Sequence, residues 1–125
     1  MMENLKNKHG SIRANDLNRH LAEADKPLVI DVRPGDLFAE THVPGSINIP
    51  QAELSQRRAE LPVDLDSAIV MVCGIGKFSK PTTLYLKSLG YRNARSLKGG
   101  INEWVRKELP TESGEPGASA TGGRS

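Results

Sequence analysis

Short apolar runs alternate with amphipathic stretches along residues 11–110, with links of only a few residues between them. The apolar runs are typical of buried strands, and stretches with apolar residues three or four positions apart are typical of helices. This alternation predicts an α/β fold with a mainly parallel sheet. The expected strands cover residues 11–14, 27–32, 46–50, 67–73 and 94–99, and the expected helices cover residues 16–24, 34–42, 51–61, 80–90 and 100–109.

Some residues mark the expected ends and buried faces of these helices. Asn15 and Ser79 are predicted N-caps, because their side chains can accept hydrogen bonds from the first free N–H groups of a helix. Gly90 is the predicted C-cap of the helix at residues 80–90. The side chains expected to face the core from the last two helices are Leu84, Leu86, Leu89, Ile101, Trp104 and Val105.

The two ends of the chain differ from this middle region. Residues 111–125 contain no Leu, Ile, Val, Met or aromatic residue, so they cannot bury enough apolar surface to offset the entropy of ordering. We therefore predict a disordered tail at residues 111–125 and a flexible N-terminus at residues 1–10. The expected single domain, residues 11–110, is long enough to form a hydrophobic core.

The composition excludes several classes of partner. Charged residues make up 26% of the chain but the net charge is only +2, with no basic block, so no nucleic-acid partner is expected. The longest apolar run, residues 68–73, is too short to span a membrane, and the N-terminus has no apolar signal segment. A single cysteine forms no internal disulfide and fits a reducing compartment, so we expect a cytoplasmic protein.

That cysteine, Cys73, lies at the carboxyl end of the most apolar predicted strand. The five residues 74–78 separate it from Ser79. We expect this loop to curl over a helix N-terminus with its amides pointing inward, because Gly74 and Gly76 permit positive φ values. A thiolate in that cradle gains from the helix dipole and several N–H donors, and the cradle also suits an anionic substrate.

The residues by themselves leave two interpretations of Cys73 open: a reactive thiolate or a small buried apolar side chain. Lys77 and Lys80 add positive charge beside the loop. A P-loop is excluded, because the positions that require Gly and Ser or Thr hold Met71 and Phe78.

No cofactor and no metal are expected. One cysteine and three scattered histidines give no metal-ligand spacing. A dinucleotide fingerprint would need a glycine where Ser79 stands, and no histidine is marked out as the base of a catalytic triad.

Four motifs in order carry a family resemblance. They are Asp31-Val32-Arg33, then His42-x-Pro44-Gly45-Ser46 with Asn48-x-Pro50, then Cys73 with Gly76 and Ser79, and finally Leu89-Gly90-Tyr91 with Gly99-Gly100 and Trp104. With these motifs the chain resembles the rhodanese family of single-domain sulfurtransferases from about residue 28 to residue 104. The resemblance implies a five-stranded parallel sheet with helices on both faces.

The resemblance also implies thiosulfate sulfurtransferase activity with Cys73 as the catalytic residue. Cys73 would take the outer sulfur of a small anionic donor such as thiosulfate and hold it as a persulfide, and cyanide or a thiol would then accept it. A thiol protein such as a sulfur carrier or thioredoxin is a further possible acceptor. The implied substrate-binding residues are those of the loop: Gly74, Ile75, Gly76, Lys77, Phe78 and Ser79.

Phe78 departs from the family pattern, which commonly has Arg or another polar residue there. Lys77, one position earlier, offers a point charge without the bidentate fork of Arg. Two interpretations of Phe78 stay open. It could make the mouth of the loop apolar and favour a persulfide or protein donor, or it could pack on a neighbouring loop.

Three other functions compete with thiosulfate sulfur transfer. A phosphatase or arsenate reductase of the same fold has a loop one residue longer that ends in Arg, and no Arg lies between Cys73 and Arg92. A non-catalytic partner-binding module usually lacks the cysteine. A persulfide carrier with weak thiosulfate activity remains the main alternative, because of Phe78.

Other motif residues are expected to belong to the scaffold. Asp31 and Arg33 are predicted to form a structural ion pair or hydrogen bonds. His42 is predicted to hydrogen-bond within its turn, and Trp104 is predicted to lie in the core.

Overall fold

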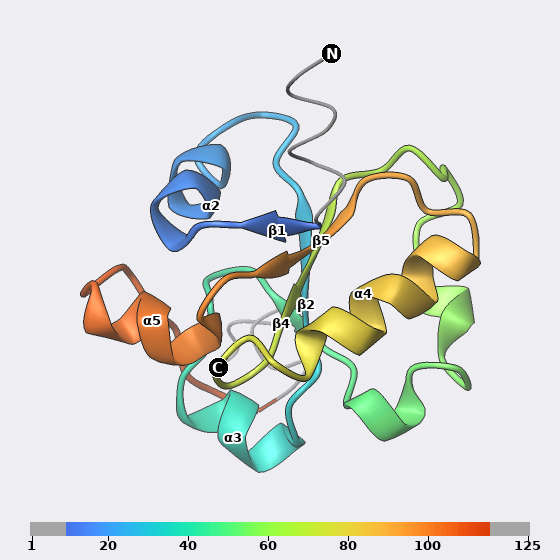
Figure 1. Cartoon of the computed structure of the whole chain (residues 1–125). Coiled ribbons are helices and arrows are strands. Elements are labelled where there is room, and N and C mark those ends of the chain that lie inside the picture. The colour runs from blue at the N-terminus through green and yellow to red at the C-terminus, as the bar shows by residue number, and fades with distance from the viewer. Residues whose placement is uncertain (1–9, 116–125) are drawn as a thin grey trace.

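The computed structural model describes residues 10–115, which form a five-stranded sheet covered by helices (Figure 1). The strands are β1 (Ser11–Ile12), β2 (Leu28–Asp31), β3 (Ile47–Asn48), β4 (Ile69–Val72) and β5 (Ala94–Leu97). They lie in the order β1-β5-β4-β2-β3, and every neighbouring pair is parallel. The predicted five-stranded parallel sheet is therefore confirmed.

Strand β4 is central because its side chains are apolar on both faces. All four of its residues are buried, which is the pattern of a strand covered on two sides. Val70 points into one core cluster and Met71 into the other, as the two-residue period of a strand requires. Neighbouring β2 keeps register with it, so that Asp31 pairs with Val72.

Helices cover both faces of the sheet, as predicted. Helices α2 (Ala14–His20) and α5 (Gly100–Arg106) bury Leu17 and Trp104 on one face. Helix α4 (Ser79–Ser88) buries Leu86 on the other (Figure 1). Helix α3 (Gly35–Glu40) follows β2. No helix within residues 10–115 is long and apolar enough to cross a lipid bilayer.

The single helix predicted for residues 51–61 is wrong. The segment forms two short 3₁₀ helices, η1 (Gln51–Glu53) and η2 (Arg58–Glu60), joined by turns. Only Leu54 and Leu61 anchor it to the core, and they lie too far apart to form a continuous apolar stripe.

Several predicted helix details also differ. Arg13, not Asn15, is the N-cap of α2, because β1 already ends at Ile12 and Ala14 is buried as the first helical residue. On α4 the buried face consists of Ser79, Thr82, Thr83 and Leu86, whereas Leu84 is 66% exposed. The helix therefore packs against the sheet largely through small polar side chains, and the spacing of apolar residues in the sequence does not predict that these are buried. Likewise, Val105 is exposed on α5.

The prediction that residues 111–125 are disordered is wrong for the first few of them, which contact the loop and helix around residues 39–42. Glu112 forms an antiparallel bridge with His42 through two backbone hydrogen bonds of 2.8 and 2.9 Å, and Gly114 N donates to Ala39 O over 2.8 Å. Backbone groups, which carry no compositional signal, hold this segment in place. The rest of the predicted tail, residues 116–125, and residues 1–9 of the predicted flexible N-terminus lie outside the described residues.

Candidate active site

The candidate site lies at the carboxyl edge of the sheet, where ligands of parallel α/β folds usually bind. Cys73 directly follows β4 and is only 2% exposed. The loop of residues 74–78 then leads into α4, which begins at Ser79. The chain thus places its only thiol between the end of the central strand and the start of a helix.

Three polar groups converge on the Cys73 sulfur. The backbone N–H groups of Gly76 and Ser79 donate to Sγ over 3.0 and 3.2 Å, and Ser79 Oγ lies 3.4 Å from it. Hydrogen bonds from backbone N–H groups favour negative charge on the atom that accepts them. The expected amide cradle is therefore present, and it favours the reactive interpretation of Cys73 over a merely apolar one.

Ser79 acts differently from its predicted role as an N-cap. The N-cap position belongs to Phe78, and Ser79 is the first helical residue, fully buried. Its N–H donates to Sγ, and its hydroxyl oxygen accepts from the thiol instead of accepting from the free N–H groups of the helix. The carbonyl of Ser79 accepts hydrogen bonds from Thr82 and Thr83, which ties it to the next turn.

Only one of the two loop glycines has the expected positive φ. Gly76 has a φ of +87°, and a Cβ added there would lie 2.9 Å from the backbone N of Gly99. Gly74 does not have a positive φ, and a Cβ there would meet nothing within 4 Å. Gly76 therefore shapes the cradle, whereas the expectation for Gly74 is wrong.

The Gly99-Gly100 pair supports the loop from behind. Both residues have positive φ, and the next two N–H groups bind the start of the loop: Ile101 N donates to Cys73 O over 2.8 Å, and Asn102 N donates to Gly74 O over 3.0 Å. A Cβ on Gly100 would collide with Cys73 O and would lie 2.5 Å from Gly74 O. Sequence reasoning used this pair only as a family motif, although two consecutive glycines between a strand and a helix signal a close approach of backbones.

The crest of the loop is apolar and faces solvent. Ile75 is 52% exposed and Phe78 is 60% exposed, with Lys77 and Lys80 exposed beside them. The high exposure of Phe78 contradicts the alternative in which it packs on a neighbouring loop. Of the predicted substrate-binding residues, Gly76 and Ser79 contact the sulfur, while Ile75, Lys77 and Phe78 surround the loop's outer face.

A buried ion pair stabilises the adjacent strand end. Arg33 Nε and Nη2 donate to the carboxylate of Asp31 over 2.8 to 3.2 Å, and Nη2 also donates to Thr41 O over 2.6 Å. Asn48 Nδ2 donates to the carbonyls of Asp31 and Arg33. The structural role predicted for Asp31 and Arg33 is confirmed.

His42 also has the predicted hydrogen-bonding role. Its Nδ1 lies 2.7 Å from Phe38 O, and its ring stacks on that of Phe38 with centroids 3.7 Å apart. The side chain is buried, and the backbone of His42 forms the bridge to Glu112. Trp104 is fully buried, as expected.

The fold and the loop define an α/β protein with a thiol cradled by amides at the carboxyl edge of its sheet. Residues 13–107 match the family of the rhodanese-like domain, and the chain belongs to that family. A sulfurtransferase of Allochromatium vinosum is 31% identical over 99 residues, which cover 79% of this chain and 91% of the relative. The human thiosulfate:glutathione sulfurtransferase is 32% identical over 102 residues, which cover 72% of this chain and 89% of the relative.

A solved structure agrees with this assignment. The crystal structure of a rhodanese-related protein from Thermoplasma volcanium aligns with a TM-score of 0.73 and 29% identity, over 82% of this chain and 97% of that one. Family membership and similarity to proteins named sulfurtransferases support rhodanese-type sulfur transfer as the activity of this chain.

Proposed function

We propose that the protein moves a sulfane sulfur from thiosulfate, or a similar small anionic donor, to cyanide or a thiol through a persulfide on Cys73. The observation that carries the proposal is the convergence of two backbone N–H groups and the Ser79 hydroxyl on the chain's single thiol. A merely structural cysteine has no need of the two N–H donors or of the hydroxyl beside them. Because this chemistry requires a free thiol, we place it in a reducing compartment such as the cytoplasm.

The first half-reaction loads the sulfur. The Cys73 thiolate attacks the outer sulfur of thiosulfate, a bond forms between Sγ and that sulfur, and the S–S bond of thiosulfate breaks. Sulfite leaves with the electron pair of the broken bond. The N–H groups of Gly76 and Ser79 are already directed at Sγ, so they stabilise negative charge on the cysteine and the new persulfide without rearrangement.

The second half-reaction unloads the sulfur. An acceptor thiolate or cyanide attacks the terminal sulfur of the persulfide, and Cys73 leaves again as a thiolate. Splitting the transfer through a covalent intermediate gives ping-pong kinetics. The exposed Ile75 and Phe78 favour a second role, in which the persulfide is delivered to a protein thiol that covers this apolar crest.

Intact-mass spectrometry tests the proposal directly. Incubation of the purified protein with thiosulfate should add about 32 Da at Cys73, the mass of one sulfur atom, and cyanide should remove it with release of thiocyanate. A protein that stays at its original mass with thiosulfate but gains the sulfur from a low-molecular-weight persulfide would be a persulfide carrier. No gain from either donor would contradict the proposed function.

Replacing Phe78 with Arg should improve the use of thiosulfate. The added cation lies at the exposed mouth of the loop and attracts the dianionic donor, so KM for thiosulfate should fall by about two- to fivefold at low salt, with little change in kcat. Leu84→Arg is the matched control, because it adds the same charge at an exposed position on α4 outside the loop. Steady-state kinetics with cyanide as the acceptor give KM and kcat for the two variants.

The same Phe78→Arg variant separates sulfur transfer from phosphatase chemistry. Only five residues separate Cys73 from Ser79, and we infer that a loop of this length is too small to surround the three equatorial oxygens of a phosphoryl group. We therefore expect no hydrolysis of aryl phosphates by the wild type or the variant. A gain in phosphate hydrolysis without a gain on thiosulfate would show that Phe78, rather than loop length, selects the substrate.

A further inference from the structure

Two exposed faces of the protein leave the sheet at the same edge. Strands β2 and β4 are parallel neighbours with Asp31 opposite Val72, so the segments that follow them begin side by side at the carboxyl edge. Helix α3 follows β2, and the thiol loop with the start of α4 follows β4 (Figure 1). Each segment presents charged and apolar side chains to solvent, and the charges of the two are opposite.

The first face, the thiol-loop face, is positive around an apolar centre. It consists of Ile75, Lys77, Phe78 and Lys80, all of them exposed. Neither lysine forms an ion pair with a carboxylate of residues 10–115. Lys80 is the second residue of α4, and the first turn of that helix holds no acidic residue. A cation there is unfavourable, because the N-terminal end of a helix is itself positive.

The second face, the α3 face, is negative around an apolar centre. Phe38 points from α3 into the core, so Asp36 and Glu40 lie on the outer side of the helix, next to Leu37, which is 40% exposed. Two carboxylates four residues apart on a helix repel each other. Glu40 also ends α3, whose last turn has no basic residue, and the C-terminal end of a helix is itself negative.

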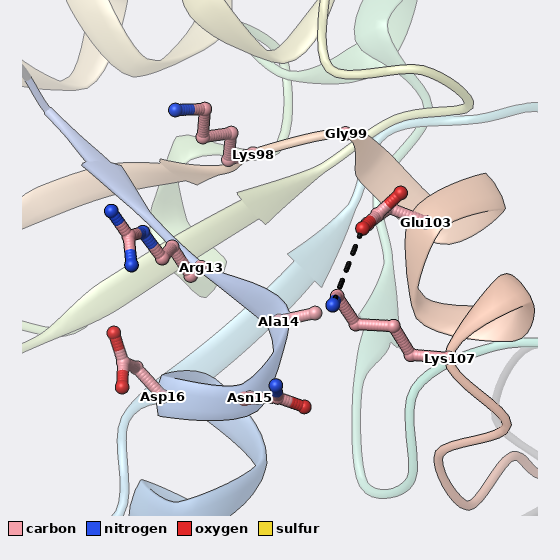
Figure 2. A pocket seen from close by; sticks show the side chains of 8 residues that line it. All are labelled: Arg13, Ala14, Asn15, Asp16, Lys98, Gly99, Glu103 and Lys107. Atoms are coloured by element: carbon pink, nitrogen blue, oxygen red, sulfur yellow. Dashed lines mark ion pairs between the residues drawn. The ribbon is translucent and has the colours of Figure 1, made fainter.

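Charges elsewhere on the molecule are balanced differently. In the cavity of about 680 Å³ at the carboxyl ends of β1 and β5, Glu103 pairs with Lys107 at 3.6 Å (Figure 2). Asp16, which also lines this cavity, pairs with Arg19 at 3.0 Å. The carboxylates there have partners on their own chain, whereas those of the α3 face have none in the part of the chain that the structure describes.

We propose that the thiol-loop face of one copy of this chain binds the α3 face of a second copy. Because the two faces lie at the same edge, a two-fold axis between them forms both contacts at once, in a self-complementary interface. The lysines then meet carboxylates, and Phe78 and Ile75 meet Leu37. A second copy is the occupant that fits, since this chain carries both halves of the complementary pair.

The association is weak and depends on salt. Only three exposed apolar side chains lie in its centre, which is less than a standard interface buries, so Kd should be on the order of 10–100 µM at low salt. The charged contacts lie at the surface and are screened as salt is added. In the dimer each α3 face covers the mouth of the partner's thiol loop, and dilution opens it again.

Sedimentation velocity on the full chain tests the contact without any turnover, so the result does not depend on the proposed function. The wild type should pass from monomer to dimer between about 1 and 500 µM in 50 mM salt. Lys77→Glu combined with Lys80→Glu reverses the thiol-loop face, and Asp36→Lys combined with Glu40→Lys reverses the α3 face. Each double variant alone should raise Kd by about tenfold or more, because like charges then face each other.

An equimolar mixture of the two double variants should dimerise as well as the wild type. In the mixed pair each face of one protein again meets the opposite charge on the other, so both contacts are restored. The two variants also attract each other through their net charges, which calls for a control that shares the net charge but not the position.

Lys26→Glu combined with Arg58→Glu is that control. Lys26 precedes β2 at the amino edge of the sheet and Arg58 belongs to η2, and both are exposed. Alone, the control should dimerise as the wild type does. With the variant reversed on the α3 face it should bind about tenfold more weakly than the variant reversed on the thiol-loop face, because only one of its two contacts is complementary.

The apolar centre is tested separately. Phe78→Ser should raise Kd by about three- to tenfold, since large aromatic side chains dominate the energy of such contacts. Val63→Ser is the matched control, because Val63 is 97% exposed and lies outside both faces. It should leave Kd unchanged.

The covering of the loop mouth is a consequence that rests on the proposed function. Thiocyanate formed per mole of wild type should fall as its concentration passes Kd, and it should stay constant for either double variant over the same range. A dimer with constant turnover per mole would show that the mouth stays open and would overturn this consequence alone.

Three results would overturn the contact itself. A wild type that stays monomeric up to 500 µM in 50 mM salt is the first. A dimer that neither double variant weakens would place the interface elsewhere on the molecule. Two monomeric variants whose mixture also stays monomeric would show that the two faces do not meet.

Discussion

The variant Cys73→Ser is expected to lose sulfur transfer completely while keeping the fold. A serine hydroxyl neither attacks a sulfane sulfur at a useful rate nor forms a persulfide, so thiocyanate production should fall to the background of the buffer. The side chain stays nearly isosteric, and its oxygen can still accept from Gly76 and Ser79. The free energy of unfolding should therefore change by no more than about 1 kcal/mol.

A second variant distinguishes the cradle from the thiol. Adding Ser88→Cys to Cys73→Ser restores one cysteine to the chain, at an exposed position on α4 without the converging amides. It should remain inactive. Activity in either variant, measured as thiocyanate released from thiosulfate and cyanide, would mean that the cradled thiol does not carry the reaction.

Gly100→Ala should cause the next largest loss. The methyl group would collide with Cys73 O and crowd Gly74 O, and the residue would keep a φ of +62° that disfavours any side chain. The backbone must shift to relieve the collision, and a displacement of about 1 Å at a reacting group costs on the order of 10²-fold in rate. Strain and overpacking together should lower the free energy of unfolding by about 2–5 kcal/mol.

Gly45→Ala is the control for Gly100→Ala. Gly45 has a similarly positive φ of +78°, but a Cβ there would meet nothing within 4 Å. It should therefore lose about 1–2 kcal/mol of stability without losing activity. Denaturant unfolding measures the free energy of unfolding of both variants, and kcat/KM for thiosulfate measures their activity. A Gly100→Ala protein as active as Gly45→Ala would show that the loop does not depend on its support from α5.

The sequence was most informative where local chemistry alone decides the structure. The apolar run of β4 and the alternation around it predicted the parallel sheet, since a strand apolar on both faces has to be covered on both. The glycines and the helix start after Cys73 likewise predicted amides around the sulfur. Both features depend on residues close together in the chain.

The features that could not be predicted depend on contacts between distant segments. The hydrogen bonds from Ile101 and Asn102 to the start of the thiol loop join the first turn of α5 to the end of β4, which are far apart in sequence. The bridge between His42 and Glu112 uses backbone groups, which every residue has. The segment at residues 51–61 has helix-forming residues, but its few core contacts were not enough to support a continuous helix.

The backing of the thiol loop by α5 also has a consequence for protein synthesis. The carbonyls of Cys73 and Gly74 meet their partners only when residues 101 and 102 have joined the fold, close to the end of the domain. While the ribosome still covers those residues, the emerging chain already carries its thiol, but the support behind the loop is missing. The protein therefore acquires its chemistry last, after nearly all of the domain has been made.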